Sequence, residues 1–191
     1  MNFNLRVARD ITYPYAYRHN AFSEDECKKI IELAKLKVMQ HATTVGESEE
    51  RKSTIAWLDI SPETETIFRR VAHEMEVLNN CFYGFDLWGF ESMQYTEYGV
   101  GDKYNFHVDT IWGDVDPRFA TRKLSASILL EDSFEGGELV MITGKYDQPE
   151  TIELRAGTIA VFPSFMWHSV RPVISGIRKS LVVWALGPKF C

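Results

Sequence analysis

We predict an α+β fold, in which N-terminal helices pack on one outer face of a β-rich jelly roll. Two observations lead to this prediction. From about residue 20 to 86, apolar residues recur at helical spacing, whereas from about residue 87 to 187 short apolar or alternating runs are separated by turn residues. Many short strands are typical of a sandwich or barrel, and helices followed by strands are typical of α+β proteins.

Two helices are expected in the first half of the chain. Ser23 is a good N-cap, because acidic residues follow it in the first turn and apolar residues then recur at helical spacing to about Met39. The second helix is expected to begin at Ser61 and Pro62, a capping residue followed by proline at the first helical position. Its buried face is expected to consist of Ile67, Phe68, Val71, Met75 and Leu78.

One strand is expected between the helices and eight are expected after them. The breaks between the later strands carry turn residues, among them the pair Gly136 and Gly137, Gly144, Gly157 and Gly176. The strands are expected over residues 53–60, 89–95, 104–108, 124–131, 138–142, 151–154, 158–162, 167–172 and 179–186.

The bulk composition is that of one globular domain, residues 1–191, because this length is typical of a single domain with a buried core. The net charge of -6 gives no general attraction for nucleic acid. No apolar run approaches the roughly 20 residues that span a bilayer, and the N-terminus lacks the apolar core of a signal peptide. We therefore expect a cytoplasmic protein that binds neither membranes nor nucleic acid.

The three cysteines are far apart and form neither a CxxC motif nor a disulfide framework. Cys27 and Cys81 have apolar neighbours and are expected to be buried thiols, whereas Cys191 is expected to be exposed. Unpaired cysteines are typical of a reducing compartment.

His107, Asp109 and His168 form the candidate metal site. Side chains two residues apart in a strand point to the same side, so the predicted strand that ends in the HxD sequence would project His107 and Asp109 together. Two imidazoles and one carboxylate are the ligand set that holds non-haem Fe(II) and leaves positions open for oxygen chemistry. An isolated HxD sequence more often lies in a surface strand than in a metal site. Here His168 and Arg178 complete the pattern, which makes the metal site the preferred interpretation. The other histidines, His19, His41 and His73, are not expected to be ligands.

Arg178 follows His168 and is expected to open another strand of the same wall. A guanidinium can grip a carboxylate with two parallel hydrogen bonds, so Arg178 is a candidate for holding a dicarboxylic co-substrate. The alternative is a surface arginine after a turn. Ser125 and Ser127 lie in a neighbouring predicted strand, where one of them would assist at this carboxylate or both would be ordinary strand serines.

Further motifs surround these residues between about residues 94 and 186. They are Tyr98-x-x-Gly101-Asp102-Lys103-Tyr104-x-x-His107-x-Asp109, Gly136-Gly137-Glu138-Leu139, the run 157–163, His168-Ser-Val-x-Pro-Val and Gly176-x-Arg178.

Together these motifs resemble the prolyl 4-hydroxylase branch of the Fe(II)/2-oxoglutarate dioxygenases. The resemblance implies a double-stranded β-helix, with His107, Asp109 and His168 on Fe(II) and Arg178 on the C5 carboxylate of 2-oxoglutarate. It also implies O2 as second co-substrate, ascorbate as reductant, and release of succinate and CO2. Procollagen-type members of the family carry lysine at the position of Arg178, whereas many oxygen-sensing and bacterial members carry arginine.

The resemblance also suggests residues around the metal. Tyr98 aligns with family tyrosines at the co-substrate, and Tyr104 and Trp184 with residues at the substrate, although each would also suit a core position. The segment 110–123 is long enough for a binding loop, with a solvated loop as the alternative, and the polar loop 46–51 is a weaker candidate for closing over a substrate. The candidates within the longer segment for gripping a peptide are Trp112, Arg118 and Arg122.

The leading functional expectation is hydroxylation of proline in a peptide or protein, and a hydroxylase of free amino acids or other small molecules is the runner-up. A nucleic-acid demethylase of the AlkB type would carry a second arginine six residues after Arg178, where this chain has Trp184. A non-catalytic cupin-like binding module would not need all three ligands and the arginine, so the presence of all four residues counts against it. A Zn²⁺ hydrolase could use the same ligands but leaves Arg178 unexplained.

Overall fold

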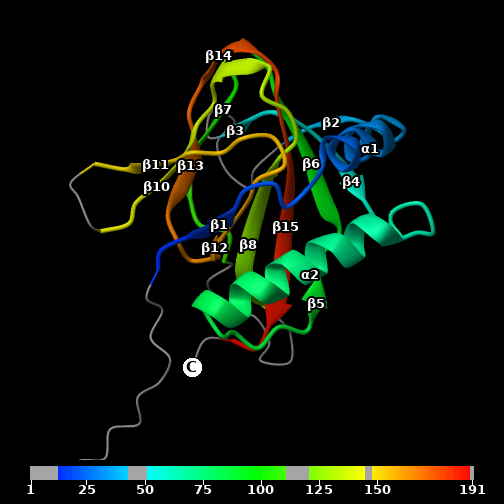
Figure 1. The fold of residues 1–191 in the computed structure, drawn as a ribbon. Helices are drawn as coiled ribbons and strands as arrows, with labels where there is room; N and C mark the ends of the chain where they lie inside the picture. The colour runs from blue at the N-terminus through cyan, green and yellow to red at the C-terminus, as the bar shows by residue number, and fades with distance from the viewer. Residues whose placement is uncertain (1–12, 43–50, 111–120, 145–147, 190–191) are drawn as a thin grey trace, which may run out of the picture.

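A computed structural model describes residues 13–42, 51–110, 121–144 and 148–189 (Figure 1). It confirms the predicted α+β jelly roll, with two helices on one outer face. The helices are α1 (Glu24–Lys35) and α2 (Glu65–Phe82). The strands are β1 (Ala16–Arg18), β2 (Gln40–His41), β3 (Arg51–Lys52), β4 (Thr54–Leu58), β5 (Gly89–Phe90), β6 (Met93–Tyr98), β7 (Lys103–His107), β8 (Thr121–Leu129), β9 (Phe134–Gly136), β10 (Leu139–Met141), β11 (Glu150–Ile152), β12 (Ile159–Pro163), β13 (His168–Val170), β14 (Val173–Gly176) and β15 (Arg178–Gly187).

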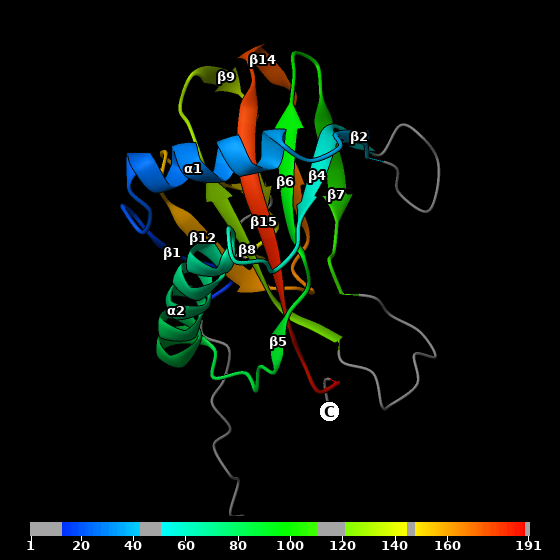
Figure 2. The same ribbon diagram turned by 90° about the vertical axis from the view of Figure 1, so that its right-hand side faces the viewer.

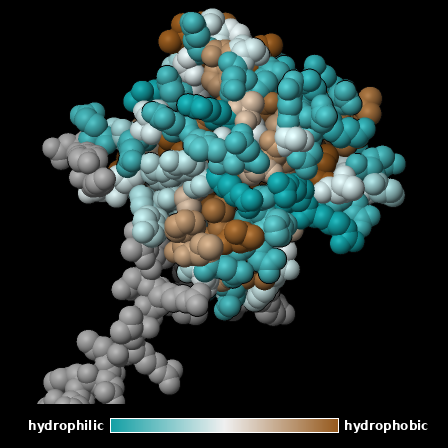
Figure 3. Space-filling model, in the orientation of Figure 1, coloured by the Kyte–Doolittle hydropathy of each residue, from teal (hydrophilic) through white to brown (hydrophobic). Residues whose placement is uncertain are grey.

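The strands form a large and a small sheet. The large sheet has eight strands in the order β1-β12-β8-β15-β6-β4-β2, with β5 paired to β15. The small sheet has the order β11-β10-β13-β7-β3, and β14 pairs with β9 in a separate two-stranded sheet. Figure 2 shows α1 and α2 lying across the outer face of the large sheet. The surface seen in Figure 3 is largely hydrophilic and is interrupted by apolar patches.

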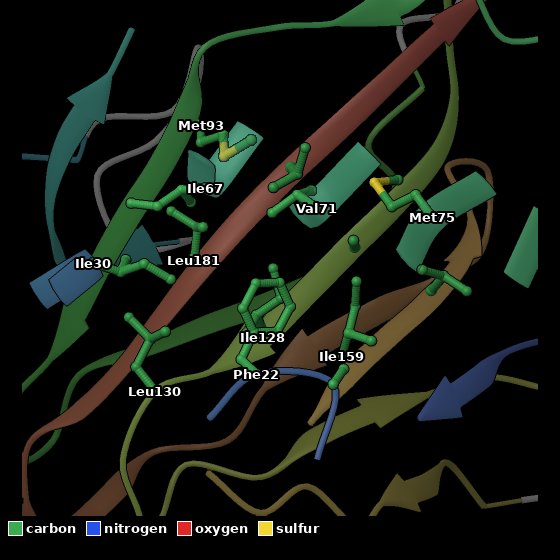
Figure 4. Close-up of a cluster of buried hydrophobic side chains, with 14 of the residues drawn as sticks. Phe22, Ile30, Ile67, Val71, Met75, Met93, Ile128, Leu130, Ile159 and Leu181 are labelled. Atoms are coloured by element: carbon green, nitrogen blue, oxygen red, sulfur yellow. The ribbon is translucent and has the colours of Figure 1, made fainter. Parts of the chain in front are cut away.

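Two apolar clusters lie on opposite faces of the large sheet. In the outer cluster, Ile30 of α1 and Val71 of α2 face Ile128 of β8 and Leu181 of β15 (Figure 4). The inner cluster lies between the two sheets and includes Phe162 of β12 together with residues of the small sheet. Because side chains alternate along a strand, β15 sends Leu181 to the helices and its even-numbered neighbours into the space between the sheets.

Helix α1 begins as predicted and ends earlier. The Ser23 hydroxyl accepts a hydrogen bond from the amide of Glu26, whose carboxylate accepts one from the amide of Ser23, and together they form a capping box. The helix ends at Lys35, before the expected end near Met39. The next apolar residues, Leu36 and Val38, are 81% and 79% exposed, so no buried face continues beyond Lys35.

Helix α2 begins at Glu65, later than the predicted start at Ser61 and Pro62. The residues from Pro62 to Thr64 form a turn instead. The hydroxyl of Thr64 accepts a hydrogen bond from the amide of Ser61 and donates one to the carbonyl of Asp59, which stabilises this turn ahead of the helix. The predicted apolar face is confirmed: Ile67, Val71, Met75 and Leu78 are buried, and Phe68 packs partly buried against the same core.

Several short strands were not predicted from the sequence. β1, β2, β3, β9 and β14 contain only two to four residues each, too few to show a period. The strand expected over residues 89–95 is two strands, β5 and β6, interrupted at residues 91 and 92.

The expectation for the cysteines was half right. Cys27 is buried on the face of α1 that packs against the core, whereas Cys81 lies on the exposed face of α2. Cys191 lies outside the described residues. Among the described helices, none is both long and apolar enough to cross a membrane.

A Gly157→Ala substitution is expected to destabilise the fold by at least ~2 kcal/mol. Gly157 has φ +77°, which costs about 1–2 kcal/mol for a residue with a Cβ, and an added Cβ would lie 2.1 Å from the carbonyl oxygen of Phe22. Gly101→Ala is the matched control, because Gly101 has φ +78° and no atom within 4 Å of an added Cβ. Chemical denaturation should therefore give a clearly smaller loss for Gly101→Ala, and equal losses would refute the clash.

Candidate metal centre

His107 and His168 are brought together by two neighbouring strands of the small sheet. They are register partners in the β13–β7 pairing, and their ring centroids are 4.2 Å apart. Asp109 faces both rings: its Oδ1 is 3.7 Å from His107 Nε2 and its Oδ2 is 3.5 Å from His168 Nε2. The structure thus brings together all three predicted metal-ligand candidates.

The position of Asp109 does not follow from strand alternation, contrary to the expectation. β7 ends at His107, and Asp109 lies in a bend beyond it. The amides of Asp109 and Thr110 both donate to the carbonyl of Ser164, at 2.8 and 3.0 Å. A turn contact with the segment after β12 therefore directs the carboxylate towards the histidines.

The two imidazoles are oriented by the same kind of backbone contact. Nδ1 of His107 is 2.9 Å from the carbonyl oxygen of Asn105, and Nδ1 of His168 is 2.9 Å from that of Met166. A carbonyl can only accept, so Nδ1 of each ring is the donor, and Nε2 is the ring nitrogen that faces Asp109. Histidines that bind a metal through Nε2 usually donate the other ring N–H to an oxygen in this way.

The charge state of the site suits a metal. Burial lowers the pKa of His107 to about 4, and the neighbouring His168 contributes in the same direction. Burial raises the pKa of Asp109, but His168, His107, Ser125 and Trp184 outweigh it and the net direction is downward. His107 is therefore neutral and Asp109 ionised near pH 7, as metal binding requires.

The three residues fit a divalent metal. One ligand atom from each lies within 4.8 Å of the others, and Oδ2 of Asp109 is buried without a hydrogen-bond partner among the described residues. Two imidazoles and one carboxylate on one side leave the opposite side open, which is the donor set that suits Fe(II).

Arg178 is a buried cation in the same cavity. It begins β15, pairs in register with Tyr98 and is 2% exposed. Its Nη1 donates to the hydroxyl of Ser180 at 2.8 Å, and its guanidinium carbon lies 5.7 Å from the centroid of the Tyr98 ring. Within the described part of the chain no carboxylate pairs with it. Burial lowers the pKa of Arg178, and a buried cation without a counterion is a place for an anionic ligand.

The serine beside Arg178 is not one of the two expected. Ser125 Oγ lies 2.9 Å from the hydroxyl of Ser164, close to Asp109, and Ser127 lines the cavity without a hydrogen bond to Arg178. The serine that accepts a hydrogen bond from Arg178 is Ser180. The i, i+2 spacing of Arg178 and Ser180 on one strand was the signal that could have identified it.

The metal-ligand candidates and Arg178 open into one cavity of about 580 Å³. Tyr98, Tyr104 and Trp184 line it, and so does Arg122, which lies in β8 and not in the loop expected over residues 110–123. Tyr104 stacks on His107 with ring centroids 3.5 Å apart. Arg122 donates two hydrogen bonds of 2.6 Å to Glu91 and lies 3.9 Å from the centroid of the Trp184 ring. Trp112, Arg118 and the loop 46–50 lie outside the described residues.

Sequence reasoning missed Arg51 as a site residue. β3 places Arg51 opposite Tyr104 of β7, where its Nη2 donates to the side chain of Gln94 at 2.7 Å. Its guanidinium carbon lies 4.8 Å from the centroid of the Tyr104 ring, and it lines the cavity. No periodicity marks a two-residue strand, which is why the sequence pattern did not identify this position.

The chain is similar to known oxygenases in sequence. A profile of the 2OG-Fe(II) oxygenase superfamily matches residues 93–186. A PKHD-type hydroxylase of Shewanella oneidensis is 36% identical over 92 residues, which cover 47% of this chain and 40% of that protein. A PKHD-type hydroxylase of Klebsiella pneumoniae is 37% identical over 93 residues, with the same two coverages. The chain thus spans about two fifths of the length of the curated relatives it matches.

Solved structures with the same fold cover nearly all of the chain. A prolyl-4-hydroxylase of Pseudomonas putida superimposes with a TM-score of 0.72 at 20% identity, covering 91% of this chain and 92% of that one. A viral collagen prolyl hydroxylase from Paramecium Bursaria Chlorella virus-1 gives 0.72 at 22% identity, covering 92% and 97%. These likenesses confirm the double-stranded β-helix. Over residues 93–186 the chain is thus similar to the 2OG-Fe(II) oxygenase superfamily, and its donor set and fold agree with that similarity.

Proposed function

We propose that this chain is an Fe(II)- and 2-oxoglutarate-dependent hydroxylase that acts on proline in a peptide or protein. One observation carries the proposal: two histidines, one carboxylate and a buried arginine that has no counterion among the described residues open into a single cavity. Metal ligands alone would suit a hydrolase as well. The buried Arg178 offers a binding site for an anionic co-substrate, which it would hold at a fixed distance from the metal.

In this proposal each residue has a defined task. His107, Asp109 and His168 would hold Fe(II), and Arg178 would orient the distal carboxylate of 2-oxoglutarate, supported by Ser180. When bound, iron and 2-oxoglutarate would supply an oxidation that consumes one O2, placing one oxygen atom in succinate as CO2 is released and the other in the C–OH group that replaces the target C–H bond, with ascorbate keeping the iron reduced. The apolar walls exclude water and position the target.

The choice of a peptidyl proline rests on two supports. The names of the structural relatives include prolyl hydroxylases, one of them in complex with a peptide fragment of hypoxia inducible factor. The cavity also has aromatic walls formed by Tyr104 and Trp184, which offer flat apolar surfaces to a pyrrolidine ring.

A free amino acid or another small acid is the second candidate. Arg51 favours it, because this cation lines the cavity and pairs with no carboxylate of the described residues. It could hold the carboxylate of a free amino acid, a group that an internal peptide residue lacks.

The test is succinate formation by the full chain with Fe(II), 2-oxoglutarate and ascorbate, followed by mass spectrometry. A panel of proline-containing peptides is compared with free proline and other free amino acids. The expected product is a peptide about 16 Da heavier, consistent with one inserted oxygen, and chelation of iron should abolish it. Modification of free amino acids alone would favour the second candidate. Turnover with Zn²⁺ and without 2-oxoglutarate would contradict both.

A further inference from the structure

A series of contacts connects Trp184 to Asp109 along one wall of the cavity. Trp184 lies opposite Ser125 in the β15–β8 pairing, and the hydroxyl of Ser125 is 2.9 Å from that of Ser164. The carbonyl of Ser164 in turn accepts the amide of Asp109 at 2.8 Å. Both Trp184 and Asp109 line the same cavity. Two strands and one turn therefore connect Trp184 and Asp109 on one wall of the cavity.

Two polar atoms on this wall have no hydrogen-bond partner among the described residues. They are Nε1 of Trp184 and Oδ2 of Asp109, in residues that are 5% and 8% exposed. An indole N–H can only donate and an ionised carboxylate can only accept. Buried polar groups without partners are uncommon in folded proteins. Each of these two atoms offers what the other lacks.

The indole is held in place by its own neighbours. The Arg122 guanidinium lies 3.9 Å from the centroid of its ring, and the ring of Trp57 lies 6.1 Å away. Arg122 is fixed in turn by two hydrogen bonds to Glu91. The direction of the N–H bond is thus set by packing that does not involve Asp109.

We propose that Trp184 is a positioning residue, whose indole N–H holds one oxygen of the Asp109 carboxylate and so presents the other oxygen to the metal. This goes beyond the substrate-wall role expected for Trp184. It rests on the proposed function only in taking His107, Asp109 and His168 as metal ligands. Hydrogen bonds from outer residues commonly orient metal-binding carboxylates in this way.

The test is the affinity of the metal-free full chain for Co²⁺, measured without oxygen by its visible absorption. Trp184→Phe keeps an aromatic ring and removes the N–H, and it is expected to weaken Co²⁺ binding by roughly 10–100-fold, the usual cost of losing an outer-shell partner. The Co²⁺ spectrum is also expected to change, because the carboxylate is no longer held in one orientation. Trp57→Phe is the matched control, because phenylalanine keeps an aromatic ring beside Trp184, and it should change the affinity by less than about twofold, far below the effect of losing an outer-shell partner.

Nuclear magnetic resonance gives a second readout that loss of packing would not reproduce. The cross-peak of the Trp184 indole N–H is identified as the one missing from the Trp184→Phe spectrum. In the wild-type chain this peak is expected to move downfield when Zn²⁺ binds, because the N–H proton then donates to a carboxylate of fixed orientation. Should Trp184→Phe fail to fold, benzothienylalanine at position 184 replaces the N–H by sulfur within a bicycle of the same shape, and the same loss of affinity is expected.

Unchanged Co²⁺ affinity and spectrum in a folded Trp184→Phe chain would overturn the proposal. Equal losses in Trp184→Phe and Trp57→Phe would overturn it too, because they would indicate packing alone. Both measurements use the metal without any substrate. An inactive chain that still gives these metal-binding results would therefore count against the proposed reaction and not against the role of Trp184.

Discussion

A His107→Ala chain is expected to form no detectable succinate and to bind Fe(II) at least ~100-fold more weakly than the wild type. Removal of an outer-shell partner already costs about 10–100-fold, and His107 supplies one of only three candidate ligand atoms. The remaining Asp109 and His168 cannot fix a metal on one side of the cavity. Anaerobic metal titration and the succinate assay measure the two losses separately.

His73→Ala is the control for this substitution, because His73 lies on the exposed face of α2, away from the cavity. It is expected to match the wild type in both assays. Since His107 also stacks on Tyr104, circular dichroism should accompany the measurements to establish that the variant is folded. A folded His107→Ala chain with normal metal affinity would rule out His107 as a ligand.

An Arg178→Met chain is expected to need at least roughly 30-fold more 2-oxoglutarate for half-maximal turnover. Truncation of one partner of a buried charge pair costs about 2–5 kcal/mol, and each 1.4 kcal/mol is a factor of ten. Turnover at saturating 2-oxoglutarate should fall much less, because the metal ligands are untouched. Methionine fills most of the buried volume, and an apolar replacement of a buried charge is often tolerated by the fold.

Two further variants sharpen this result. Arg178→Lys keeps the charge and loses the two-pronged geometry, so its KM for 2-oxoglutarate is expected to lie between those of the wild type and Arg178→Met. Arg171→Met removes an exposed arginine outside the cavity and should leave the KM unchanged. An unchanged KM in Arg178→Met would mean that another group holds the co-substrate.

Much of the site could be predicted from the sequence because its parts are carried by local patterns. The HxD spacing marks His107 and Asp109, and the turn before Arg178 marks the start of a strand. The capped helix at Ser23 is equally local, since its N-terminal hydrogen bonds join residues three apart. Patterns that join residues only a few positions apart can be recognised in a single sequence.

The features that were missed depend on contacts between distant segments. Asp109 is directed by the carbonyl of Ser164, and Arg51 reaches the cavity because a two-residue strand pairs with β7. The unpartnered N–H of Trp184 becomes visible only when β8 and β15 lie side by side. Neither composition nor periodicity records such pairings, because the partners are separated by tens of residues.

The two halves of the site are supported by different parts of the fold. Arg178 and Trp184 project from β15, whose opposite face is braced by both helices, whereas His107 and His168 belong to the small sheet. The side chains of Phe106 and Trp167, next to these histidines in the chain, are 38% and 52% exposed. Substitutions in the helix–sheet core therefore act first on β15, which carries the anchor for the co-substrate carboxylate and the indole proposed to hold Asp109. Fold stability and the affinity for the co-substrate are linked through this one strand, whereas the two histidines depend on the pairing within the small sheet.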